Sequence, residues 1–174
     1  MMDIVLTGFM GSGKTTIGPL LAQELRLPFF DLDVQIVQLT GCSIVELFED
    51  GENYFRQKEQ EVLQKVIKQP GVLALGGGTP TRPSNRELLR HSGAQIILLE
   101  AQIQTIWQRL QQTQVQRPLV QTKDQLVALK KQRQKNYQQV ANLCVQTDNY
   151  TPQQVVKQIA EQVLILRGSE NYRN

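Results

Sequence analysis

The 174-residue sequence has few of the residues that cross-link small proteins or bind metals. It holds one histidine, His91, and two cysteines, Cys42 and Cys144, about a hundred residues apart. Without a Cys-x-x-Cys pair, neither a disulfide framework nor a zinc site is expected. A chain of this length with 40% hydrophobic residues can bury a core unaided. We therefore expect residues 1–174 to form a single domain in a reducing compartment, the cytoplasm.

Long apolar runs and blocks of like charge are also absent. No apolar run approaches the about 18 residues of a membrane span, and the first residues lack the basic and apolar regions of a signal peptide. The 19 basic and 16 acidic residues give a formal charge of only +3. The sequence gives no reason to expect a membrane or nucleic-acid partner, and we expect a soluble monomer.

Short apolar segments alternate with longer amphipathic ones. The apolar runs predict strands at residues 4–7, 28–30, 72–75, 95–99 and 143–145. Capping-box patterns predict that helices begin after Ser43, Ser84 and Thr151. This alternation predicts an α/β fold in which helices cover both faces of a parallel sheet.

A glycine-rich motif follows the first predicted strand. The segment GFMGSGKT, residues 8–15, matches GxxxxGK[ST] and precedes an amphipathic helix, which makes a chance glycine turn an unfavourable alternative. In such a P-loop, main-chain amides cradle phosphates, Lys14 reaches the β- and γ-phosphates, and the Thr15 hydroxyl binds Mg²⁺. A nucleoside triphosphate with Mg²⁺ is the expected ligand. The candidate nucleotide-binding residues are Gly11, Ser12, Gly13, Lys14, Thr15 and Thr16.

Two acids and three glycines follow the next predicted strands. Asp31 and Asp33 come at the end of the second strand, where open α/β sheets bind ligands, although short acidic residues also cap helices. The third strand ends in Gly76-Gly77-Gly78, where many P-loop proteins carry an aspartate for Mg²⁺. Asp31 is therefore the nearest candidate for a second magnesium partner. The three glycines would expose main-chain amides to a ligand.

The rest of the chain adds one candidate ion pair and one long irregular segment. Arg56 and Glu59 lie three residues apart on a predicted helix, so Glu59 can brace Arg56. Residues 110–124 form an irregular stretch of the length often seen in lids. No NKxD or DxxG motif is present at the positions expected for a GTPase switch.

Five motifs in order resemble the shikimate kinase family over residues 3–165. They are the P-loop, Phe-Asp-x-Asp at 30–33, Gly-Glu-x-x-Phe-Arg-x-x-Glu at 51–59, Leu-Gly-Gly-Gly at 75–78 and Arg-Pro-Leu at 117–119. The resemblance implies a three-layer α/β/α fold of the nucleoside monophosphate kinase type, with a five-stranded parallel sheet and a mobile lid. It implies transfer of the γ-phosphate of ATP to the 3-hydroxyl of shikimate, giving shikimate 3-phosphate and ADP.

Other functions remain open on the sequence alone, since a fold does not determine the acceptor. One alternative is another small-molecule P-loop kinase, such as a gluconate or nucleoside monophosphate kinase. A different class is a nucleotide-binding relative that has lost catalysis.

The resemblance assigns roles on the acceptor side, within a substrate-binding region of about residues 31–62 and beyond it. Asp33 is expected to hold the shikimate hydroxyl as a catalytic residue beside Lys14, while Asp31 binds Mg²⁺ through water. Arg56 and Arg133 are expected to bind the carboxylate, although Arg133 could instead be a solvated helix arginine. Gly77 is expected to offer its N–H to the ring substituents, and Gly76 and Gly78 to let the loop pass close to the substrate.

The resemblance also assigns three residues on the nucleotide side. Arg117 is expected to close over the phosphates as the catalytic arginine of the lid, with an ordinary loop arginine as the alternative. Arg109 and Pro152 are expected on the two faces of the adenine, with surface charge and helix initiation as their alternatives. The stretch between Arg109 and Arg117 is one residue longer than the family pattern suggests and is rich in glutamine.

Overall fold

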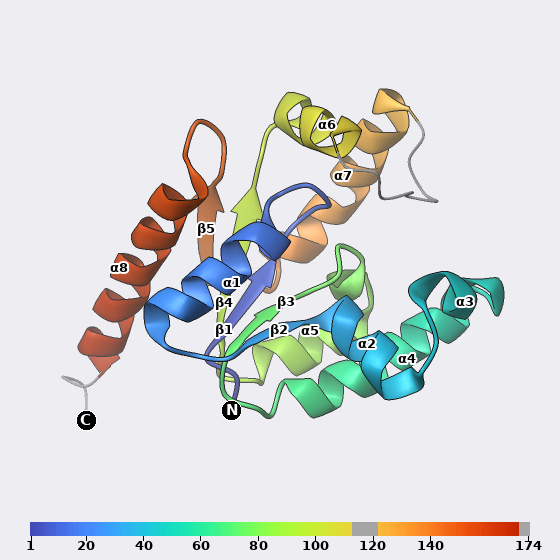
Figure 1. The fold of residues 1–174 in the computed structure, drawn as a ribbon, viewed down its shortest axis with the longest axis horizontal. Coiled ribbons are helices and arrows are strands. Elements are labelled where there is room, and N and C mark those ends of the chain that lie inside the picture. Colours follow the sequence, from blue (N-terminus) through green and yellow to red (C-terminus); the bar gives the residue numbers. More distant parts are fainter. Residues whose placement is uncertain (113–121, 171–174) are drawn as a thin grey trace.

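The computed structural model describes residues 1–112 and 122–170, with side chains described as far as residue 165 (Figure 1). Five parallel strands form one sheet in the order β2-β3-β1-β4-β5. Their bounds are β1 Ile4–Thr7, β2 Phe29–Asp31, β3 Val72–Ala74, β4 Gln95–Glu100 and β5 Leu143–Gln146. All five predicted strands are confirmed. β2 begins after Pro28, which has no N–H for the ladder but whose carbonyl accepts a hydrogen bond from Val72 N.

Eight α-helices and one 3-10 helix are assigned within the described residues. They are α1 Lys14–Leu25, α2 Leu32–Thr40, α3 Ile44–Glu49, α4 Glu52–Val66, η1 Thr79–Thr81, α5 Pro83–Arg90, α6 Ile103–Gln111, α7 Lys123–Gln138 and α8 Pro152–Glu170. None of the helices in the described part of the chain combines the length and apolar character that a membrane span requires.

The helices cover both faces of the sheet, as predicted (Figure 1). On one face, Ile4 and Leu6 of β1 share a core with α1 and α8, whereas Val5 points to the opposite core beneath α4 and α5. A third cluster lies beneath α6 and α7 and includes Phe9 and Ile106. This arrangement confirms the three-layer α/β/α fold, because alternate strand residues enter cores on opposite faces.

The helix starts show where local sequence patterns succeed and fail. Ser43 forms its capping box with Glu46, and Thr151 exchanges the equivalent bonds with Gln154. The predicted start after Ser84 is wrong. Helix α5 begins two residues earlier, at Pro83, and has no side-chain cap. The fixed φ of proline suits the first helical position.

Helices extend into both ends of the segment that was predicted to be irregular, residues 110–124. Leu110 and Gln111 belong to α6, and α7 begins at Lys123. Thr122 and Gln125 form a capping box that the sequence prediction missed. Residues 113–121 lie outside the described residues, so the lid stays a prediction.

The connections that follow the strands meet at one edge of the sheet. The P-loop follows β1, Asp31 ends β2, and residues 76–78 follow β3. In Figure 1 the P-loop emerges between α6 and the connection from β3 to α5. The carboxyl edge of an open α/β sheet is where ligands bind, so the fold places the predicted site residues at the expected edge.

Candidate functional site

The P-loop holds its lysine against its own main chain. Lys14 Nζ donates to the carbonyl oxygens of Gly8 and Phe9, at 2.8 and 3.0 Å, and the residue is 9% exposed. Gly8 has a φ of +143°, and a Cβ there would collide with the Leu99 carbonyl oxygen. Glycine is therefore required for the loop to pass over β4. The loop ends at Gly13, after which the first turn of α1 carries the exposed side chains of Thr15 and Thr16.

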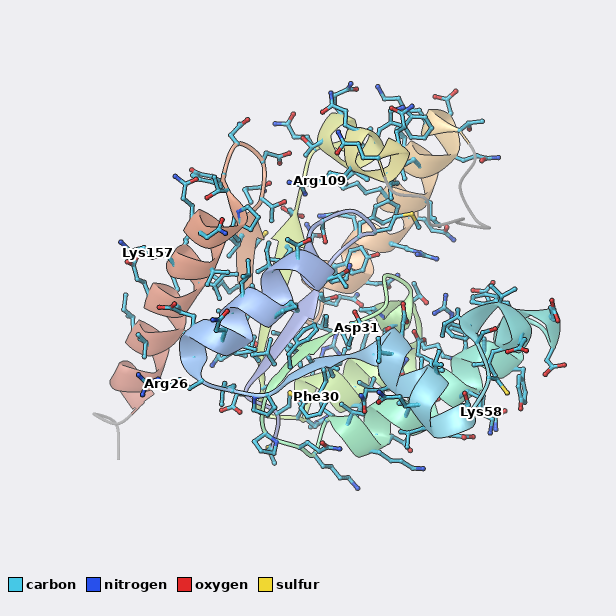
Figure 2. The ribbon with its side chains drawn as sticks, in the orientation of Figure 1. Arg26, Phe30, Asp31, Lys58, Arg109 and Lys157 are labelled. Atoms are coloured by element: carbon cyan, nitrogen blue, oxygen red, sulfur yellow. The ribbon has the colours of Figure 1, made fainter. Side chains whose placement is uncertain are left out.

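Arg109 joins the P-loop to the end of β5. Its Nη1 atom donates to the Gly11 carbonyl at 3.0 Å and to Thr147 Oγ1 at 3.1 Å, while Nη2 donates to the Thr147 carbonyl at 3.0 Å. The label in Figure 2 marks it beneath α6, on the P-loop side. The Arg109 side chain is thus held against the P-loop, and its predicted contact with the adenine stays a prediction.

Asp31 and Asp33 take different positions at the start of α2 (Figure 2 labels Asp31). Asp31 Oδ1 accepts hydrogen bonds from the N–H groups of Asp33 and Val34, at 3.0 and 3.4 Å. Asp31 is therefore the N-cap of α2, the alternative that the sequence left open. Asp33 lies in the first turn of that helix and is not its N-cap.

Asp33 faces the other charged residues of the site. A Cβ built on Gly76 would lie 3.1 Å from Asp33 Oδ1 and 3.2 Å from Glu59 Oε1. The pKa of Asp33 is raised from 3.8 to about 6, chiefly by desolvation of the carboxylate and also by the nearby charges of Asp31 and Glu59, whereas Lys14 and Arg56 oppose the rise. Solvent still reaches the side chain, but the surrounding protein removes enough water for desolvation to dominate.

Arg56 is braced as the sequence predicted. Its Nη1 atom donates to both carboxylate oxygens of Glu59 at 3.1 Å, and Nη2 donates to Glu52 at 3.3 Å. Glu59 is fully buried and also accepts from Thr79 Oγ1 at 2.7 Å. A buried carboxylate with three such bonds holds the guanidinium in one orientation.

The glycine loop, Gly76–Gly78, lies where the other parts of the site converge. Its first residue faces Asp33 and Glu59. A Cβ on Gly77 would lie 3.4 Å from the P-loop amide of Met10, and one on Gly78 would overlap the Arg56 guanidinium, 2.6 Å from Cζ. Side chains at Gly76 and Gly78 would thus crowd Asp33, Glu59 and Arg56. The glycine loop adjoins both these charged residues and the P-loop.

Arg133 approaches the glycine loop from α7. It is 7% exposed, and its Nη1 atom donates to the Gly77 carbonyl at 3.3 Å. The Tyr137 hydroxyl donates to the same oxygen at 2.6 Å, and Tyr137 is 1% exposed. Arg133 is therefore a buried residue of the site, and the alternative of a solvated helix arginine is wrong. We call Asp33, Arg56, Glu59, Gly76–Gly78 and Arg133 the acceptor cluster.

Magnesium would meet hard oxygen donors at this edge of the sheet. Within the described residues no group of three histidine, cysteine, aspartate or glutamate side chains could hold a metal alone. The Thr15 hydroxyl and the Asp31 carboxylate fit Mg²⁺, which commonly takes one or two protein oxygens and completes its shell with water and phosphate. Their role as metal ligands stays a prediction.

The structure also shows contacts of residues to which the sequence analysis gave no role. Thr79, Tyr137 and Thr147 each bond to a predicted site residue, namely Gly76, Gly77 and Arg109 in turn. Asp148 is 8% exposed and accepts from Gln102 N with both oxygens, which ties β5 to the start of α6. Tyr137 carried a usable signal, since it lies one helical turn after Arg133. The hydroxyls of Thr79 and Thr147 carried none, because their partners are distant in sequence.

Pro152 and Arg117 are the two residues predicted to bind the nucleotide whose roles rest on no contact described above. Pro152 is the first residue of α8, which agrees with helix initiation and leaves its contact with the base a prediction. Arg117 lies outside the described residues, so its predicted role over the phosphates also stays a prediction.

Comparisons with known proteins agree on one family. The family model described as shikimate kinase matches residues 10–164. A shikimate kinase of Enterococcus faecalis is 38% identical, the match covering 94% of this chain and 99% of the relative. One from Limosilactobacillus fermentum is 40% identical, with 91% and 93% covered.

Solved structures give the same result. A shikimate kinase from Acinetobacter baumannii in complex with shikimate has a TM-score of 0.86 and 34% identity, with 93% of this chain and 92% of the other covered. A gluconokinase from Sinorhizobium meliloti has a TM-score of 0.65 at 15% identity, with 99% and 97% covered. At that identity the likeness concerns the fold alone.

Proposed function

This chain belongs to the shikimate kinase family, and we propose that it transfers the γ-phosphate of ATP to the 3-hydroxyl of shikimate. One observation carries the proposal: Arg56 and Arg133 reach the glycine loop from different helices, beside an aspartate of raised pKa and next to the P-loop. Two planar guanidinium groups suit a small carboxylate. The product would be shikimate 3-phosphate, with ADP released.

The acceptor cluster would orient the alcohol and receive its proton. The 3-hydroxyl oxygen forms a bond to the γ-phosphorus while the bond to the β,γ-bridging oxygen breaks, and that electron pair leaves with ADP. The hydroxyl proton passes to the Asp33 carboxylate. A pKa of about 6 makes Asp33 a better base than an ordinary aspartate, yet leaves it mostly ionised at pH 7. Phosphoryl transfer needs positioning more than a strong base.

The nucleotide side would neutralise charge on the phosphates. Lys14 would exchange its bonds to the carbonyl oxygens of Gly8 and Phe9 for the β- and γ-phosphates, and the amides of residues 11–16 would bind phosphate oxygens. Thr15 and Asp31, the latter through water, would hold Mg²⁺, which neutralises developing phosphate charge when bound. Arg109 and Pro152 would flank the adenine, and Arg117 would act from the predicted lid.

The decisive experiment is a coupled assay of ADP release with and without shikimate. Strong dependence on shikimate is expected, and indifference to shikimate would refute the proposal. Gluconate and nucleoside monophosphates form the control panel of acceptors, and they are expected to fail. If the protein bound ATP but released no ADP, it would instead be a nucleotide-binding relative that has lost catalysis.

We further infer that the protein acts as a monomer in the cytoplasm, where ATP is available. Light scattering at working concentration tests that state directly.

A further inference from the structure

The Gly77–Gly78 peptide is held from the α7 side by two donors. Its carbonyl oxygen accepts from Tyr137 at 2.6 Å and from Arg133 Nη1 at 3.3 Å. The preceding carbonyl, of Gly76, accepts from Thr79 N at 3.1 Å. Both peptide planes of the glycine loop are therefore fixed, although glycine has the least intrinsic preference for one conformation.

Fixing the carbonyl also fixes the amide. In a trans peptide the C=O and N–H point in opposite directions, so the Gly78 N–H points away from α7. The amides of Gly76, Gly77 and Gly78 donate to no acceptor within the described residues. The three glycines themselves lie where Asp33, Arg56 and the P-loop converge.

We propose that Tyr137 is a positioning residue for acceptor binding: its hydroxyl anchors the Gly77 carbonyl, and this contact orients the glycine loop, with the Gly77 N–H expected to meet shikimate, beside Arg133. This inference rests on the proposed function. The Tyr137 hydroxyl donates to the Gly77 carbonyl, so Tyr137 would act through this peptide. Burial raises the pKa of Tyr137 to about 12, so the hydroxyl stays protonated and remains a donor throughout the working pH range.

The test is Tyr137→Phe, which removes one hydroxyl and keeps the ring that packs with Phe9, Leu98 and Leu126. A hydrogen bond of ordinary strength is worth about 0.5–1.5 kcal/mol, so the shikimate KM should rise about 2- to 12-fold. The ATP KM and the kcat should stay within about twofold. Tyr150→Phe is the matched control, because it removes a hydroxyl from a side chain that is 54% exposed between β5 and α8, and its shikimate KM should not change.

A double-mutant cycle that combines Tyr137→Phe with Arg133→Lys makes the test more specific. Tyr137 and Arg133 donate to one oxygen, so their effects on the shikimate KM should be coupled rather than additive. An unchanged shikimate KM in Tyr137→Phe, or an equal loss for both substrates, would overturn the inference. Failure of the variant to fold would assign Tyr137 to the core and would also overturn it. If the parent protein lacked shikimate-dependent activity, the proposed function itself would fail, so the two failures are distinguishable.

Discussion

The nucleotide side of the site consists mainly of main-chain groups, whereas the acceptor cluster depends on charged side chains, of which Arg56, Glu59 and Arg133 are buried. On the nucleotide side, Lys14 and Arg109 both bond to P-loop carbonyls. In the acceptor cluster, Arg56 and Glu59 neutralise one another, and their neighbour Asp33 has a raised pKa. A main-chain site depends on local conformation, while a site of buried charges depends on several partners, because each unpaired charge is costly.

The largest expected effect is that of Asp33→Asn. The variant keeps the size of the side chain but removes the proton acceptor, so kcat should fall about 10²- to 10⁴-fold. Nucleotide binding should persist, because the P-loop is untouched. The measurement is single-turnover ADP release at saturating shikimate, with ATP affinity measured separately. Equal loss of ATP affinity would contradict the division between the two sides.

Arg56→Ala should weaken acceptor binding by about 30-fold or more in shikimate KM, since truncating one partner of a buried charge pair costs about 2–5 kcal/mol. The ATP KM should change little. Arg82→Ala is the control, since Arg82 makes one long bond, of 3.4 Å, to Gln60 Oε1.

Arg56 has two roles, to bind the acceptor and to neutralise Glu59, and measurements of stability separate them. The single variant leaves the fully buried Glu59 without its cation, so its Tm should fall. Adding Glu59→Gln should recover much of the Tm without restoring the shikimate KM. Recovery of both quantities would show that Arg56 only maintains the fold.

The pH dependence should come from the acceptor cluster. Because the pKa of Asp33 is about 6, kcat/KM for shikimate should fall about tenfold per pH unit below pH 6 as the carboxylate becomes protonated. Nucleotide binding without acceptor, measured over the same range, is the control. A flat profile between pH 5 and 7 would contradict Asp33 as the base.

The same titration should appear in folding stability with a defined sign. The folded protein binds the Asp33 proton more tightly than the unfolded chain, so this stabilisation is complete below pH 3.8 and is lost as the pH rises through about 6. Asp33→Asn should therefore be more stable than the parent at pH 7, by on the order of 1 kcal/mol given the partial exposure of the side chain. Urea unfolding at pH 4 and pH 7 measures the difference.

The smallest expected effect is that of Arg109→Ala. In contrast to Arg56→Ala, this variant should change the KM for ATP and not the KM for shikimate. The ATP KM should rise about 5-fold, because three hydrogen bonds that support the P-loop and the end of β5 are lost. The shikimate KM should stay the same. Arg90→Ala, which removes an exposed arginine bonded to the Gln139 carbonyl, serves as the control. A larger effect on shikimate than on ATP would break the comparison between the two sides.

Local patterns in the sequence determined the elements and the nucleotide side. The P-loop, the five strands and the capping boxes at Ser43 and Thr151 depend on short-range rules of spacing and hydrogen bonding, so they could be predicted. The failure at Ser84 arose where two local rules competed and Pro83 prevailed. The pairing of Arg56 with Glu59 was also predictable, because both lie on one helix face.

Only the tertiary structure decided how the acceptor cluster is assembled. Arg56, the glycine loop and Tyr137 come from three elements separated by tens of residues, and no local pattern states that Tyr137 bonds to the Gly77 carbonyl. The raised pKa of Asp33 likewise depends on water excluded by distant parts of the chain. Hydrogen bonds and desolvation act over a few ångströms in space, whatever the separation in sequence, so these properties arise only when the chain has folded.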